Sequence, residues 1–316
     1  MAPADLQQVI QLLKGNYINP AALNEAELNR AMLSGVLTRL GGGAILLPKK
    51  TADADATNDL LYSEIMAGHI GYFRFGALTP ANLQALDAAL QKYAGKKIDA
   101  IVIDLRASAA TNDFATAAEF VDRFIPKGKP LFSLRRTAGK QDRAFISDRD
   151  PSYTGLMLAL IDEGTAGPAE AIAGDLRLYT KALLIGQTTA GRAVEYSDLP
   201  LNGGRILRAA VSEAVLPEER AIFPAGLKPD LPVELSTEDK QMIFQQSAQA
   251  GGMGPFVFEN ERPHLNEAAL LAGRNPDIDA MEASQRRKTT EKAPPKDVVL
   301  QRAIDLVTSL GIYQKK

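Results

Sequence analysis

The hydrophobic and polar positions of this 316-residue chain follow two different periods in its central part. Continuous apolar runs at Ile98–Leu105, Met157–Ile161 and Lys181–Gly186 predict strands that are buried on both faces. Between these runs, apolar residues recur at helical spacing after Pro80 and Pro168, and proline suits a first helical position because its missing N–H would have no partner there. Strands that alternate with helices predict an α/β fold with a largely parallel sheet and crossover helices.

Helical spacing also marks both ends of the chain. Asp5–Lys14 has one apolar face, Asn24 is a good cap for a second helix, and a final helix is predicted at Asp297–Leu310. The charged, low-complexity run Ser284–Lys296 and the polar run Lys49–Asn58 predict linkers. We therefore predict a helical region at 1–43, a strand, linker and hairpin arm at 44–68, an α/β core at 69–235 and a helical and linker region at 236–316.

Alternating segments predict two hairpins. One joins Leu60–Ile65 to His69–Phe75, and the other joins Val194–Leu199 to Gly204–Ala210 through an Asn-Gly-Gly turn. The stretch Asp142–Tyr153 is polar, and we predict a loop there.

Composition and charge exclude several classes of chemistry. The 36 basic and 38 acidic residues give a net charge of -2, so the chain has no excess of positive charge that would favour nucleic-acid binding. The chain has no cysteine and only two histidines, His69 and His264, so we expect no metal site, no cofactor and no histidine-based triad. No apolar run is long enough to span a membrane. The first residues lack the basic and apolar segments of a signal peptide, which leaves a cytoplasmic location or a trimmed signal open.

The most informative stretch is Leu156–Arg192, which predicts a strand, a tight turn, a helix and another strand. The turn reads Gly164-Thr165-Ala166-Gly167-Pro168. Many α/β enzymes place a nucleophile in such a turn, because the free N–H groups and the dipole of the following helix stabilise developing negative charge.

Several segments up to about Pro232 resemble, in order, the carboxyl-terminal processing or tail-specific proteases, which are serine endopeptidases with a Ser/Lys dyad. The segments that carry the resemblance are NYINP with the helix after it, HIGYFRF, IDAIVIDLR, FVDRFIP, Glu163–Gly174, Ala182–Arg192 and GLKPDLPV. The resemblance implies a crotonase-like α/β core and a periplasmic or secreted location. The peptide-binding PDZ domain that this family commonly inserts would be missing, because Leu47–Leu60 leaves room only for a short linker.

The departures from this family fall on its catalytic machinery. Gly167 stands where the resemblance places the nucleophilic serine, and Arg192 stands where it places the lysine base. Glycine has no nucleophile, and a guanidinium stays protonated and cannot accept a proton. Pro168 lacks the N–H that the residue after a nucleophile donates to an oxyanion hole, and Ala109 and Ala110 replace the Gly-Gly turn that the family uses as a further oxyanion region.

These changes favour a catalytically inactive relative, a pseudoprotease that binds peptide or protein ligands or acts in assembly. One alternative is an active serine-type endopeptidase with a relocated site. Its candidate nucleophiles are Thr165, Ser108, Ser152 and Ser197, and its candidate bases are Lys181 and Lys140. A second alternative is a structural protein that works through its helical ends, with a homodimer formed through Tyr17, the Leu28, Met32 and Val36 stripe and the final helix.

Arg192 supports two interpretations of its own. A guanidinium held at this position could bind a peptide carboxylate, with Thr165 as a further peptide contact. It could instead form an internal salt bridge with Glu195 or Asp162.

Overall fold

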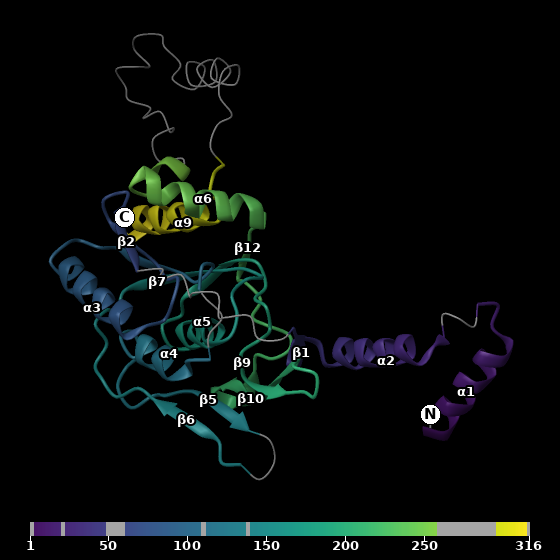
Figure 1. The fold of residues 1–316 in the computed structure, drawn as a ribbon. Coiled ribbons are helices and arrows are strands. Elements are labelled where there is room, and N and C mark those ends of the chain that lie inside the picture. The colour runs from purple at the N-terminus through teal and green to yellow at the C-terminus, as the bar shows by residue number, and fades with distance from the viewer. Residues whose placement is uncertain are drawn as a thin grey trace, which may run out of the picture. The chain divides into compact units, whose positions relative to one another are not determined.

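The computed structural model describes residues 3–19, 23–48, 61–108, 112–136, 140–257 and 295–314. It divides into two compact units, which are described separately (Figure 1). The first consists of Met1–Ala52 and Tyr196–Ala210, and the second of Asp53–Glu195 and Val211–Lys316. The linkers predicted at Lys49–Asn58 and, for its greater part, at Ser284–Lys296 lie outside the described residues.

The second unit is built on a six-stranded sheet with the order β12-β8-β7-β4-β3-β2. Its neighbouring strands run parallel from β12 to β3, and β2 pairs with β3 in the antiparallel direction as predicted for a hairpin. The strands are β2 Tyr62–Met66, β3 Ile70–Arg74, β4 Ala100–Asp104, β7 Leu156–Ile161, β8 Leu183–Gly186 and β12 Leu231–Pro232. Every residue of β4 is buried, which explains its continuous apolar run.

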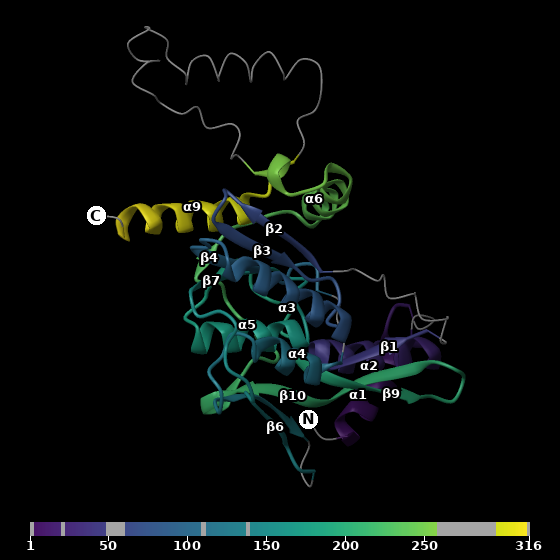
Figure 2. The same ribbon diagram turned by 90° about the vertical axis from the view of Figure 1, so that its left-hand side faces the viewer.

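Helices cover both faces of this sheet (Figures 1 and 2). Ile101 and Ile103 pack in one core with α3 Pro80–Ala94, α4 Phe114–Val121 and α5 Pro168–Tyr179. Ala100 and Val102 face the opposite core, which contains α6 Thr237–Ala250 and α9 Val298–Gln314. Successive side chains of a strand point to opposite faces, so β4 supplies both cores at once. The α/β architecture is therefore confirmed.

Polar residues cap several of these helices, including Asn24, which the sequence predicts as a cap. The side chain of Thr79 accepts a hydrogen bond from the N–H of Asn82, and that of Ser236 accepts one from the N–H of Asp239. In the first unit, Asn24 caps α2 by accepting from the N–H of Glu27. Each cap satisfies an N–H group that has no partner inside its helix.

A second, antiparallel sheet corrects two of the sequence predictions. In the second unit β5 Pro130–Arg136 pairs with β6 Arg143–Ile146 and with the part of β10 from Ser212 to Val215. The predicted loop Asp142–Tyr153 thus contains a strand, β6, which its mostly exposed side chains disguised. The predicted strand that ends at Ala210 is part of β10 Ile206–Leu216, whose extension pairs with β5 and, near Leu216, with β11 Arg220–Ala221.

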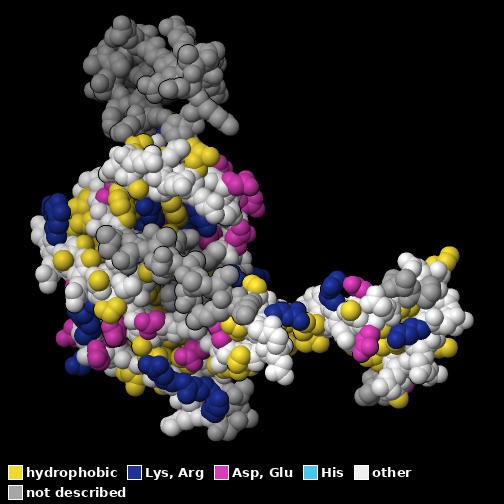
Figure 3. All heavy atoms as spheres, viewed as in Figure 1, with side chains coloured by type: hydrophobic (Ala, Val, Ile, Leu, Met, Phe, Trp, Pro, Cys, Tyr) yellow, Lys and Arg dark blue, Asp and Glu magenta, His cyan; other side chains and the backbone are white. Residues whose placement is uncertain are grey.

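The first unit contains α1 Pro3–Asn16, α2 Glu25–Leu40 and a short sheet. In this sheet β1 Ala44–Leu47 pairs antiparallel with the first residues of β10, and β9 Val194–Pro200 also pairs with β10. No residue of α2 is buried, and the apolar side chains of both helices reach the surface, as the hydrophobic atoms of Figure 3 show. Across the described ranges, no helix combines the length and apolarity that a bilayer-spanning segment needs.

Candidate functional site

The turn between β7 and α5 lies at the carboxyl edge of the parallel sheet. Pro168 is the first residue of α5, as predicted, and Gly167 precedes it with φ 63° and ψ -131°. This left-handed conformation suits glycine, which has no Cβ to clash with the backbone. Asp162 shapes the start of the turn, because its Oδ1 accepts hydrogen bonds from the N–H groups of Gly164 at 2.9 Å and Thr165 at 3.1 Å.

Thr165 is fully buried within this turn. Its hydroxyl accepts a hydrogen bond from the N–H of Asp162 at 3.0 Å and donates to the carbonyl of Leu105 at 3.3 Å. A hydroxyl that is occupied in both roles and shielded from solvent suits a structural function better than nucleophilic attack or contact with a peptide. The geometry therefore assigns Thr165 to holding the turn beside the end of β4.

A single carboxylate joins this turn to the loop that carries Arg192. Glu170 of α5 is fully buried and accepts four hydrogen bonds. Its Oε2 accepts from the N–H of Gly167 at 3.2 Å and of Arg192 at 2.7 Å, and its Oε1 accepts from the N–H of Gly191 at 2.7 Å and the hydroxyl of Thr189 at 2.5 Å. Gly167 and Arg192, the two positions where the resemblance expected a nucleophile and a base, are thus bonded to the same side chain.

The loop at 187–192 also contacts other backbone segments closely. Gly191 has φ 62°, and a Cβ at this position would lie 2.1 Å from the carbonyl oxygen of Pro224. Only glycine fits there. The N–H of Ala190 donates to the carbonyl of Thr165 at 2.9 Å, which adds a direct backbone link between the loop and the turn.

Burial and hydrogen bonding act on Glu170 in opposite directions. Removal of the carboxylate from water raises its pKa, and the hydrogen bonds from Thr189, Arg192, Gly191 and Gly167 lower it, with burial the larger effect. A carboxylate with four donors is well suited to remain an acceptor only, since its own proton would displace one of them.

Arg192 is exposed, and no ion pair of its guanidinium occurs within the described part of the chain. The two internal partners considered from the sequence are engaged elsewhere. Glu195 accepts from the hydroxyl of Ser212 at 2.6 Å and lies 3.9 Å from Arg136, whereas Asp162 pairs with Lys240. Of the two interpretations of Arg192, the geometry favours the one with an available guanidinium.

The structure does not bring the other candidate residues together as a catalytic pair. Lys181 follows α5 at the end opposite the turn, where its Nζ donates to the carbonyl of Leu178. Ser197 belongs to the first unit, and the N–H of Ser152 donates to the carbonyl of Arg123. Lys140 is exposed. The oxyanion region predicted at Ala109 and Ala110 lies outside the described residues.

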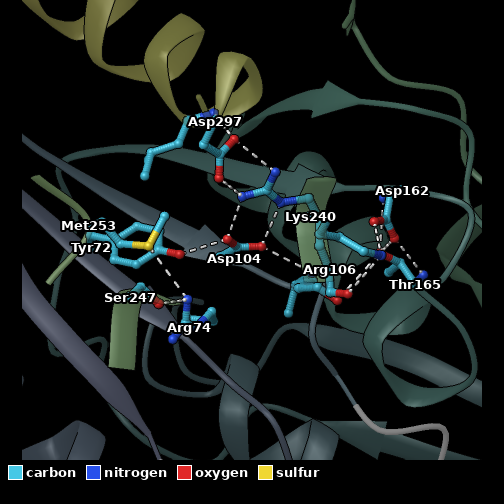
Figure 4. A network of polar contacts seen from close by, with 12 residues as sticks. Tyr72, Arg74, Asp104, Arg106, Asp162, Thr165, Lys240, Ser247, Met253 and Asp297 are labelled. Atoms are coloured by element: carbon cyan, nitrogen blue, oxygen red, sulfur yellow. Dashed lines mark hydrogen bonds and ion pairs between the residues drawn. The ribbon is translucent and has the colours of Figure 1, made fainter. Parts of the chain in front are cut away.

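A buried ionic network lies at the same edge of the sheet (Figure 4). Arg106, just after β4, forms a bidentate pair with Asp104 at 2.9 and 2.7 Å and a second bidentate pair with Asp297 at 3.0 and 2.8 Å. The hydroxyl of Tyr72 donates to Asp104 at 2.7 Å. Burial alone would raise the pKa of Asp104, but the charge and hydrogen bonds of Arg106 outweigh it, and the net direction is downward.

Lys240 of α6 extends this network to the turn. Its ammonium group pairs with Asp162 and donates to the carbonyl of Arg106 at 3.4 Å. The described residues include no group of three or more histidine, aspartate or glutamate side chains that could hold a metal ion. The network is therefore a set of internal ion pairs.

Reasoning from the sequence alone missed the partners that organise this site. Arg106 and Asp297 are 191 residues apart, and Lys240 and Asp162 are 78 residues apart, so no local pattern links them. The one available signal was Asp297, which stands at the start of the predicted final helix, where an acidic residue caps the backbone. The sequence analysis placed Asp297 only at the start of that helix, and neither its cap to Leu300 nor its pair with Arg106 was predicted.

The strand, the positive-φ turn and the buried helix N-terminus define an α/β protein with a tight strand-turn-helix that carries Gly167 at the turn. Comparison with known families gives the relationship. The sequence profile of peptidase family S41 matches residues 69–233, which is more than half of the chain, and the chain belongs to this family. This confirms the resemblance found in the motifs.

Two relatives and one solved structure extend the comparison. The chain is 24% identical over 223 residues to the carboxy-terminal processing protease CtpA of Bacillus subtilis, covering 71% of this chain and 47% of that protein. It is 27% identical over 289 residues to a carboxy-terminal-processing protease of Bartonella bacilliformis, covering 83% of this chain and 66% of that one. A candidate peptidase of Parabacteroides merdae shares the fold, with a TM-score of 0.57, 13% identity and coverage of 76% and 84%. The chain thus spans about half to two thirds of the two relatives' length.

Proposed function

We propose that this chain is a catalytically inactive member of peptidase family S41 that retains the binding edge of the family and uses it to bind peptides. The observation that carries the proposal is the shared attachment of Gly167 and Arg192 to Glu170. The backbone N–H groups of both residues donate to the same carboxylate oxygen, which supports a common site. Neither residue can perform the proton transfer or the attack that hydrolysis needs.

Peptide binding is supported by the state of Arg192. Its guanidinium is exposed, and its backbone is fixed by a 2.7 Å hydrogen bond from its N–H to Glu170. A guanidinium presents a fork of donors that matches a carboxylate, and a positioned arginine loses little freedom on binding. We therefore propose a peptide carboxylate, terminal or from an acidic side chain, as its ligand.

A protease assay with fluorescein-labelled casein tests the inactive state. We expect no hydrolysis by the wild type, and we compare it with the double variant Gly167→Ser and Arg192→Lys. Activity of the double variant alone would show an intact binding edge without its dyad. Hydrolysis by pure wild type that disappears in Thr165→Ala would contradict the proposal and support the active alternative with a relocated site.

Isothermal titration tests the binding role separately. A peptide with a free carboxyl terminus is titrated against the wild type and Arg192→Ala, with the amidated peptide as control. We expect weaker binding of the peptide by Arg192→Ala and of the amidated peptide by the wild type. Equal affinity in all three titrations would remove Arg192 from the binding site.

The exposed helices of the first unit favour a second candidate function, assembly into a homodimer. Met32 and Val36 are 45% and 56% exposed, and Tyr17 is 48% exposed, so their apolar surface has no cover within the described chain. Sedimentation of the wild type and of Met32→Glu with Val36→Glu tests this role. A dimer that dissociates in the double variant supports it, and a wild-type monomer contradicts it.

Two finer expectations belong to the same proposal. The resemblance supports a crotonase-like arrangement of the core, which an experimental structure would test. It also supports a periplasmic or secreted location, which fractionation of cells that express the native gene would test.

A further inference from the structure

The C-terminal helices contribute two charged side chains to the edge of the sheet where the proposed site lies. Asp297 immediately precedes α9, and Lys240 lies in the first turns of α6. Both helices pack on the face of the sheet opposite α5, yet Figure 4 shows the two side chains pointing toward the ends of β4 and β7. These contacts connect the last third of the chain to the loops that form the candidate site.

Asp297 holds Arg106, which stands at the start of the loop after β4. It is fully buried, it accepts from the N–H of Leu300 at 2.9 Å as a helix cap, and it binds both terminal nitrogens of Arg106. Arg106 uses its remaining donors on Asp104. Because both sides of its guanidinium bind bidentate partners, the Arg106 side chain is held in a single orientation. Ala107 and Ser108 follow Arg106 in the loop.

Lys240 connects this loop to the turn before α5. Its ammonium group contacts the carbonyl of Arg106 on one side and the carboxylate of Asp162 on the other. The fit is close, since a Cβ added to Gly164 would lie 3.3 Å from Nζ. The Lys240 side chain is 11% exposed and that of Asp162 is 7% exposed, so water screens the pair weakly.

We propose that Asp297 and Lys240 are positioning residues, which hold the 105–108 loop and the 162–167 turn in the arrangement that binds ligand. A buried ion pair adds little net stability compared with apolar groups of the same volume, because desolvation offsets the attraction. An ion pair does fix one geometry. Here the pairs of Asp297 and Lys240 hold the 105–108 loop and the 162–167 turn, and Gly167 belongs to the turn. The C-terminal helices are thus part of the site, although they carry none of its ligand-binding groups.

Hydrogen exchange measured by mass spectrometry tests the positioning role in the full-length protein. Asp297→Asn keeps the helix cap and the shape while removing the charge that faces Arg106. Lys240→Met removes the ammonium, and Lys240→Arg is its conservative counterpart. Asp87→Asn is the matched control, since Asp87 also forms a bidentate pair with an arginine, Arg123 at 2.8 and 2.7 Å, but on α3.

We expect exchange at residues 105–108 and 162–165 to become at least about tenfold faster in Asp297→Asn and Lys240→Met, with β4 and β7 themselves still protected. Lys240→Arg restores the slow exchange, and Asp87→Asn leaves both segments unchanged. Unchanged exchange at these segments in both test variants would overturn the proposal. Acceleration spread evenly over the whole second unit would overturn it as well, because it would indicate general destabilisation.

The ligand part of this inference rests on the proposed function. A fluorescein-labelled peptide with a free carboxyl terminus is the probe, and we expect at least about tenfold weaker binding by the two test variants than by Asp87→Asn. Equal affinity in variants whose loops exchange faster would refute the ligand part. Absence of binding by the wild type would contradict the proposed function instead, and the exchange experiment would still decide the positioning role.

Discussion

Two carboxylates on the same helix, Glu170 in its N-terminal turn and Asp175 near its centre, differ in the number of hydrogen bonds that they accept. Both are fully buried on α5. Glu170 accepts four hydrogen bonds, whereas Asp175 accepts one, from the N–H of Phe132 at 3.2 Å. The Oδ1 atom of Asp175 has no hydrogen-bond partner within the described residues.

The consequence appears in the ionisation of the two groups. Burial raises the pKa of Asp175 to about 8, opposed only by the bond from Phe132. Burial also raises the pKa of Glu170, but four donors oppose it there. The N-terminal turn of α5 therefore surrounds its carboxyl group with donors, whereas the centre of the helix buries a carboxyl group that has a single donor.

Removal of the better-supported carboxylate should have the largest effect. Glu170→Ala leaves three backbone N–H groups and the Thr189 hydroxyl without their acceptor, and we expect a loss on the order of 3–5 kcal/mol in the free energy of unfolding. Urea denaturation measures it. Glu170→Gln, which keeps the volume and one acceptor oxygen, should lose less. A loss below about 1 kcal/mol for the alanine variant would show that water replaces the carboxylate.

Neutralising the poorly supported carboxylate should stabilise the protein at high pH. A pKa that is higher in the folded than in the unfolded state makes ionisation favour unfolding, so Asp175 reduces stability as pH rises from about 4 to about 8. We expect Asp175→Asn to be more stable than the wild type by about 1–3 kcal/mol at pH 8.

The same two proteins should be nearly equal in stability near pH 3, where Asp175 is mostly protonated in both the folded and the unfolded state. Thermal unfolding across this pH range provides the measurement. A constant difference between the variant and the wild type at all pH values would mean that packing, and not ionisation, distinguishes them.

Loss of one donor to Glu170 should have a smaller effect. Thr189 donates to Glu170 at 2.5 Å and accepts from the N–H of Leu227 at 2.8 Å, so Thr189→Val removes two hydrogen bonds while keeping the shape. We expect a loss of about 1–2 kcal/mol by urea denaturation. Thr189→Ser, which keeps the hydroxyl, is the control. A larger loss in Thr189→Ser than in Thr189→Val would point to the methyl group instead.

Arg192→Ala should have the smallest effect on stability, below about 0.5 kcal/mol, because an exposed side chain without an ion pair contributes little. Its effect belongs to ligand binding, as described above. A large loss of stability by urea denaturation would reveal an internal role for the guanidinium and weaken the proposed binding function.

The sequence predicted the elements that depend on residues close to one another in the chain. The buried strand β4, the cap Asn24 and the proline that begins α5 all have signals within a few residues. The strand β6 was missed because only Phe145 packs inward, on Phe132 at 4.9 Å between ring centroids, and its neighbours are exposed. One inward side chain in four residues leaves no periodicity to detect.

The site was predictable in position but not in construction. Gly167 and Arg192 could be located from the order of motifs, and the structure places both beside Glu170. The partners of Asp162, Arg106 and Asp297 depend on how distant segments meet, and charge composition does not specify such pairs. The internal salt bridge considered for Arg192 could not be decided from the sequence either, because the partners of Glu195 and Asp162 also depend on how distant segments meet.

The conformation of Gly167 has a consequence for any other residue placed in this turn. A serine there would adopt φ 63° only with steric strain, on the order of 1–3 kcal/mol. Glycine avoids that strain. The backbone of the turn therefore favours glycine, and Gly167→Ser carries this cost in stability whatever residue stands at position 192.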